Sequence, residues 1–140
     1  MHTYKCTILR VVDGDTVDVD IDLGFGVWMR KERVRILGID TPESRTRDKV
    51  EKVYGNLAKN FVKNYLPVDS VQTLQTEKDG TGKFGRVLGK FLVHDRVTDS
   101  QMHLGDIMIR EYLAVEYHGQ SKDDIEEQHI KNREFITLEE

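Results

Sequence analysis

Residues 35–43 read RILGIDTPE, and the change of pattern within them indicates where a strand gives way to a helix. The stretch ends a strand-like run over residues 27–39, and Pro42 lacks the backbone N–H that a continuing strand needs. After a polar loop, apolar residues recur from 49 to 66 at spacings of three, four and seven, as on one face of an α-helix. We therefore expect a strand over 27–39 and a helix over 49–66 that ends before Pro67.

Strands are expected on both sides of this junction. Residues 3–12 are rich in β-branched and apolar side chains, and residues 17–23 alternate apolar residues with aspartates, which is typical of a half-buried strand. Residues 70–77 and 86–94 predict two more strands beyond the helix. On the strand over 27–39, the core side is expected to carry three apolar residues, namely Trp28, Val34 and Ile36.

Two further helices complete the expected layout. Residues 103–113 and roughly 122–134 have helical patterns, and Ser121 with Asp124 resembles a capping box before the second of them. Three strands, a helix, two strands and two helices are the layout of an α+β protein with a five-stranded OB-fold barrel. We expect residues 1–140 to form a single domain with an acidic C-terminal tail at about 135–140.

The charge of the chain is unevenly distributed. Its 140 residues have a net charge of −4, which argues against a simple basic nucleic-acid coat. Residues 30–52 nevertheless contain eight Lys or Arg against five Asp or Glu, and such a local basic surface can attract a polyanion.

The apolar runs of the chain do not suggest a membrane partner. No apolar run approaches the roughly 18 residues of a membrane span, so we expect no membrane partner. The N-terminal residues lack a secretory signal, so we expect an intracellular protein or a mature secreted form.

Two aspartates mark the ends of strand-like runs. Asp15 lies in the sequence Asp-Gly-Asp-Thr over 13–16, and Asp40 follows the run over 27–39. Two carboxylates, a backbone carbonyl and waters make a hard oxygen site of the kind that Ca²⁺ prefers. Taken alone, Asp-Gly-Asp-Thr is more often a simple turn. The prediction of a metal site therefore depends on the other charged residues around the aspartates.

Two arginines and a glutamate accompany these aspartates. Arg35 and Arg86 offer planar guanidinium groups that bind phosphate oxygens, and Glu43 can accept a proton from water. Each also has an ordinary interpretation, since an arginine in a strand often pairs with a nearby acid such as Glu32 or Asp40. Together, a metal ion, two arginines and a base are what hydrolysis of a phosphodiester requires.

In this combination the chain resembles the staphylococcal (micrococcal) nuclease, or thermonuclease-like, family. The matching stretches lie between residues 5 and 117 and read VVDGDTV, RILGIDTPE, VYGNLAKNF, DGTGKFGR and IREYLAVEY. The resemblance implies a Ca²⁺-dependent phosphodiesterase, acting as an endo- and exonuclease on single-stranded or frayed DNA and RNA. It also implies that the bond between phosphorus and the 5′ oxygen is broken, which leaves 3′-phosphates.

The resemblance further implies a role for each matching residue. Asp15, Asp40 and the carbonyl of Thr41 would bind Ca²⁺, with Asp13 as an outer partner of the metal. Glu43 would orient the attacking water and act as the general base, and Arg35 and Arg86 would contact the phosphate. Substrate-binding roles fall to three residues of the later segments, namely Lys83, Phe84 and Tyr117. Phe84 stands where the family has a tyrosine, which removes a hydroxyl from that position.

Two other functions are compatible with the same fold. The chain could be a noncatalytic nuclease-like OB module that binds nucleic acid or a protein partner, although such modules usually lack several of the catalytic charges. It could also be a structural calcium-binding domain, but Arg35 and Arg86 would then have no clear purpose. The sequence favours a nuclease, and we expect a monomer.

Overall fold

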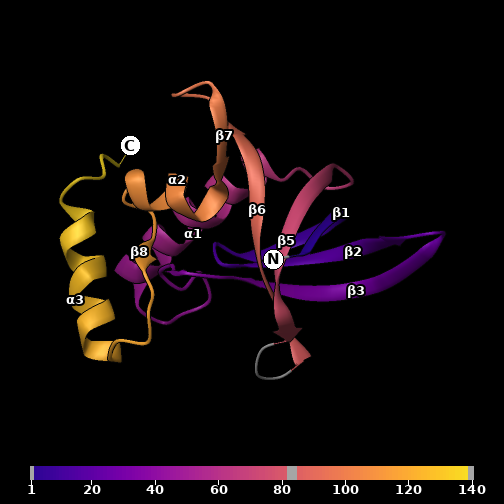
Figure 1. The fold of residues 1–140 in the computed structure, drawn as a ribbon. Helices are drawn as coiled ribbons and strands as arrows, with labels where there is room; N and C mark the ends of the chain where they lie inside the picture. Colours follow the sequence, from indigo (N-terminus) through magenta and orange to yellow (C-terminus); the bar gives the residue numbers. More distant parts are fainter. Residues whose placement is uncertain (1, 82–84, 139–140) are drawn as a thin grey trace.

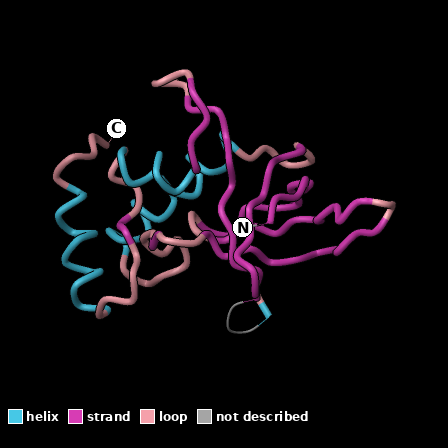
Figure 2. The backbone as a smooth tube through the Cα atoms, viewed as in Figure 1, coloured by secondary structure: helices cyan, strands magenta, loops and turns pink. Residues whose placement is uncertain are grey.

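The computed structural model describes residues 2–81 and 85–138. Over these residues the fold is α+β, with the helices gathered at one end of a strand-built body (Figures 1 and 2). Five strands form a ring in the order β3-β2-β1-β5-β6, which the parallel pairing of β3 with β6 closes. The ring confirms the expected OB-fold barrel. Its strands are β1 (His2–Asp13), β2 (Thr16–Gly24), β3 (Val27–Ile36), β5 (Val71–Thr81) and β6 (Val87–Asp95).

The remaining elements surround this barrel. The described residues contain three helices, as expected, and three short strands that the sequence did not predict. The helices are α1 (Lys49–Tyr65), α2 (Leu104–Arg110) and α3 (Lys122–Arg133), and the short strands are β4 (Ile39–Asp40), β7 (Ser100–His103) and β8 (Val115–Glu116). Strand β7 extends the sheet beyond β6, whereas β4 and β8 pair with each other in a separate two-stranded sheet.

The prediction of one continuous strand over 27–39 is wrong at its end. Strand β3 stops at Ile36, and Gly38 has a φ of +81°, a conformation that glycine adopts at little steric cost. The chain turns there and continues as β4, whose partner β8 follows α2 in the sequence. The expected helix over 103–113 is also too long, because His103 belongs to β7 and α2 ends at Arg110.

The β2–β3 hairpin projects away from the helices (Figure 1) and contains a bulge. Val19 pairs with Glu32 but Ile21 pairs with Met29, so β3 has one extra residue between these pairs. Lys31, with a φ of +55°, lies at this point. The bulge reverses the alternation of side chains, and it places Trp28 opposite Asp22 with 37% of its surface exposed. The expectation that Trp28 lies on the core side is therefore wrong, whereas Val34 and Ile36 are buried.

The hydrophobic core fixes the position of the strand ends. Fully buried side chains of the barrel strands meet apolar residues of α1 and α2, and each such side chain contributes about 1.5–3 kcal/mol. The largest of them include Ile8, Ile36, Leu74, Phe91, Leu104, Ile107 and Met108. Because these residues hold β1, β2 and β3 in register, the polar residues that follow each strand are brought to one rim of the barrel. None of the helices among the described residues is long and apolar enough to cross a membrane.

Candidate active site

Two carboxylates converge at this rim of the barrel. Asp15 lies in the turn between β1 and β2, and Asp40 ends β4. Asp15 Oδ2 and Asp40 Oδ1 each lie 3.5 Å from the same atom, Arg35 Nη2. The two aspartates are 25 residues apart in the sequence, but the end of β3 and the turn after it bring their oxygens to one place.

Arg35 is held in a fixed orientation by the backbone around it. Its Nη1 donates to the carbonyl oxygens of Ile36 at 2.9 Å and Ile39 at 3.0 Å. The side chain is 17% exposed, so the guanidinium is partly desolvated but still accessible from the cavity. A planar group with five N–H donors can bind these carbonyls with one nitrogen and face the carboxylates with the other.

A cavity of about 580 Å³ opens at this point. The structure brings together there seven of the residues that the sequence singled out, namely Asp13, Asp15, Arg35, Asp40, Thr41, Glu43 and Arg86. Glu43 is exposed to the cavity, and within the described residues its side chain makes no hydrogen bond or ion pair. A carboxylate that no described residue engages is free to hydrogen-bond a water or a ligand in this cavity.

Comparison with known proteins places the chain in a family. The model for the staphylococcal nuclease homologue family matches residues 33–136. The chain belongs to the staphylococcal nuclease family. It is 34% identical over 109 residues to the thermonuclease of Staphylococcus intermedius, which covers 78% of this chain and 54% of that protein. It is 32% identical over 115 residues to the thermonuclease of Staphylococcus hyicus, covering 82% of this chain and 56% of that protein.

A third relative is more distant. The micrococcal nuclease of Shigella flexneri is 27% identical over 125 residues, which cover 86% of this chain and 63% of that protein. The chain spans about half the length of the two staphylococcal thermonucleases it matches. The family model and the two thermonucleases confirm, at the level of the family, the resemblance that the sequence motifs indicated.

The loop that carries Glu43 is fixed by close packing against α1. Ser44 Oγ donates a hydrogen bond to Asp13 Oδ1, which ties the loop to the end of β1. On the other side, Gly55 of α1 lies against the backbone of Glu43 and Ser44. A Cβ atom at position 55 would lie 2.6 Å from Ser44 N and closer still to the Glu43 carbonyl. Glycine at position 55 is therefore what lets α1 and this loop approach each other.

We expect Gly55→Ala to destabilise the protein although it improves the helix. Alanine is favoured over glycine by about 1 kcal/mol in a helix interior, so an isolated α1 would gain stability. In the protein the methyl group must displace the loop backbone, and overpacking of this kind costs about 1–3 kcal/mol. Urea denaturation measures the free energy of unfolding. The exposed neighbour Asn56→Ala is the control and should be neutral or slightly stabilising; a Gly55→Ala protein as stable as this control would contradict the tight contact.

Helix α3 contributes a residue that the sequence analysis did not single out. His129 is 7% exposed, and its Nε2 lies 2.8 Å from Asp40 Oδ2. The cavity is lined on this side by one face of α3, formed by Lys122, Ile125, Glu126 and His129 at spacings of three, four and seven. This spacing is visible in the sequence. What the sequence could not reveal is that this face meets a residue 89 positions away.

Glu51 is a second addition to the cavity. It lies in the first turn of α1 and faces the same space as Glu43. Burial raises the pKa of Glu51, and the negative charges of Glu43 and Asp48 raise it further. The pKa of Glu51 is therefore held above the usual value for a glutamic acid side chain.

Of the three residues predicted to bind substrate, the structure describes only Tyr117, which does not line this cavity. Tyr117 follows β8, donates its backbone N–H to the Gly38 carbonyl at 2.8 Å and lines a separate cavity beside Lys90. Lys83 and Phe84 lie outside the described residues. The substrate-binding roles of these three residues remain predictions.

Proposed function

We propose that this chain is a Ca²⁺-dependent nuclease that hydrolyses single-stranded or frayed DNA and RNA. In the proposed reaction the bond between phosphorus and the 5′ oxygen is broken, and 3′-phosphates remain. The observation that carries the proposal is the meeting of Asp15, Asp40, Arg35, Arg86 and Glu43 around one cavity. Membership of a family whose relatives include thermonucleases supports the same reaction.

The residues at the rim fit a calcium ion bound with incomplete protein ligation. Asp15 and Asp40 supply hard anionic oxygens, and the buried hydroxyl of Thr41 has no hydrogen-bond partner among the described residues. No group of three or more His, Cys, Asp or Glu side chains in the described part of the chain is placed to hold an ion. Since Ca²⁺ takes about six to eight oxygen ligands, the Thr41 carbonyl, waters and substrate oxygens would complete the shell.

Each of the chain's own residues at the site would have a separate role in hydrolysis. A Ca²⁺ ion held by Asp15 and Asp40 would supply a Lewis acid for the reaction. Glu43 accepts a proton from a water whose oxygen forms a new bond to phosphorus. Arg35 and Arg86 donate to the phosphate oxygens, where negative charge accumulates in the transition state. The bond from phosphorus to the 5′ oxygen breaks, and that oxygen leaves as a hydroxyl after taking up a proton from solvent water.

We expect a 5′-labelled single-stranded DNA oligonucleotide to be cleaved with Ca²⁺ and left intact with EGTA. Mg²⁺ should support much less cleavage, because it prefers a near-ideal octahedral shell and releases its waters reluctantly. Denaturing gels compare the products with size standards that end in 3′-phosphate or 3′-hydroxyl. Treatment with a phosphatase that removes 3′-phosphates should shift the products and leave the uncut oligonucleotide unchanged.

Other outcomes would reassign the function. Products with 5′-phosphates would mean that the bond between phosphorus and the 3′ oxygen is broken. The water activated by Glu43 would then attack phosphorus from a different side. Binding of the oligonucleotide without cleavage in any metal would favour the noncatalytic module. Equal cleavage in EGTA would contradict a role for Asp15 and Asp40 in holding a cation.

A further inference from the structure

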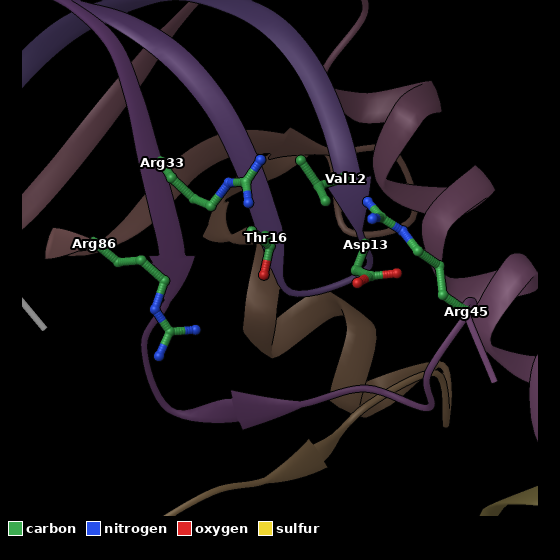
Figure 3. Close-up of a pocket in the computed structure, with 6 residues that line it drawn as sticks. All are labelled: Val12, Asp13, Thr16, Arg33, Arg45 and Arg86. Carbon is green, nitrogen blue, oxygen red and sulfur yellow. The ribbon is translucent and has the colours of Figure 1, made fainter. Parts of the chain in front are cut away.

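A second cavity, of about 340 Å³, adjoins the first and is walled by arginines. It is called the arginine pocket here and is lined by Val12, Asp13, Thr16, Arg33, Arg45 and Arg86. Figure 3 shows Arg86 on one side and Arg45 on the other, with Thr16 and Asp13 between them and Arg33 reaching in from β3. The lining contains three guanidinium groups and one carboxylate, and the Arg33 guanidinium is also paired with Asp18 at the edge of the pocket.

The arginine pocket shares part of its lining with the proposed catalytic cavity. Asp13, Thr16 and Arg86 line both spaces. Arg33 and Arg35 are two residues apart on β3, and in a strand such residues share a face. Both lie on the outward face, because Val34 and Ile36 between and beside them are buried. A chain of phosphates that places one group at Arg35 would therefore pass along this face to Arg33.

The guanidinium of Arg33 is held in one orientation by a pair of hydrogen bonds that uses only part of its N–H groups. Its Nε and Nη2 donate to the two oxygens of Asp18 at 2.9 and 3.2 Å. These two bonds use two of its five N–H groups and fix the plane of the side chain. The pair is exposed, with 47% of the Arg33 side chain accessible, so it adds little to folding stability. The pair holds the Arg33 guanidinium in place at the wall of the pocket.

We propose that the arginine pocket binds a backbone phosphate of the substrate strand next to the phosphate that is cleaved. The inference rests on the proposed nuclease function and extends it to a second subsite. Arg33 and Arg45 are the residues that bind there without lining the catalytic cavity. The subsite also accounts for the basic segment over residues 30–52 of an otherwise acidic chain. It favours a polynucleotide over a substrate with a single phosphodiester group.

The test measures binding separately from cleavage. A fluorescently labelled single-stranded DNA octamer is titrated with the Glu43→Gln protein in Ca²⁺ at several KCl concentrations, and anisotropy gives the dissociation constant. Adding Arg33→Gln and Arg45→Gln should weaken binding about tenfold at low salt. It should also reduce the slope of log K against log salt by about 0.7, the value for one phosphate contact on a single strand.

A second pair of arginines provides the matched control. Arg30 is also on β3 and pairs with Asp20 of β2, and Arg47 is an exposed residue of the same loop as Arg45. Neither residue lines the arginine pocket or the catalytic cavity. The Arg30→Gln/Arg47→Gln protein has the same net charge as the test variant, and its salt slope should equal that of the parent.

Cleavage kinetics with the active protein separate the two subsites. For a dinucleotide with one phosphodiester bond, Arg33→Gln/Arg45→Gln should leave kcat/KM unchanged, whereas KM for the octamer should rise about tenfold. Equal salt slopes for the test and control variants, with normal cleavage, would overturn the subsite and leave the nuclease proposal intact. An equal loss on both substrates would also overturn it. If the parent neither binds nor cleaves the octamer in Ca²⁺, both proposals fail.

Discussion

We expect Glu43→Gln to slow hydrolysis by about 10²–10⁴-fold, because an amide cannot take a proton from water as a carboxylate does. The two side chains have nearly the same shape, so substrate still fits and KM should change little. Stopped assays on the labelled oligonucleotide in Ca²⁺ give kcat and KM. A loss confined to kcat is the signature of an interaction made in the transition state.

The fold should be unaffected by this change. Glu43 is exposed and makes no side-chain hydrogen bond or ion pair with the described residues, and such surface changes usually alter stability by less than about 0.5 kcal/mol. Glu51→Gln makes the same change of side chain in the same cavity and is the matched control. If Glu43→Gln keeps near-full activity and Glu51→Gln does not, the base is Glu51 and our assignment of Glu43 is wrong.

The order of the five barrel strands and the three helices could be predicted because each of these elements leaves a local signal. Alternation over residues 17–23 and the spacing of three and four after Pro42 are properties of neighbouring residues, and both elements lie close to where they were expected. Asp15, Asp40 and Glu43 could be grouped for a similar reason. Charges placed where a strand stops come to a barrel rim when the strands pair, and the structure brings these three to one cavity.

What the sequence did not reveal depends on contacts between distant segments. The bulge at Lys31 reverses the faces of β3 beyond it, and no local pattern around Trp28 marks that reversal. The two residues of β4 are a strand only because β8 pairs with them. The approach of Gly55 to the Glu43 loop and the contact of His129 with Asp40 likewise join segments that only the complete fold places together.

Arg35→Lys tests whether a positive charge is sufficient at the centre of the site. Lysine keeps the charge but has a single ammonium in place of the planar guanidinium. In this structure one nitrogen of Arg35 donates to the carbonyls of Ile36 and Ile39 while the other faces Asp15 and Asp40. An ammonium cannot do both at once, so the variant loses either its anchor or its donor to the phosphate.

We expect Arg35→Lys to lower kcat on the order of 10²-fold, the usual cost of losing one donor that stabilises the transition state. KM should rise much less, because the long-range attraction between lysine and the phosphate persists. Arg30→Lys, at an exposed pair with Asp20 outside the cavity, is the control for the same change of side chain and should keep full activity. Thermal unfolding of both variants separates a lost anchor from lost chemistry. Should Arg35→Lys retain more than half of the parent's kcat, the guanidinium would act through its charge alone, and its two backbone hydrogen bonds would serve the fold rather than the reaction.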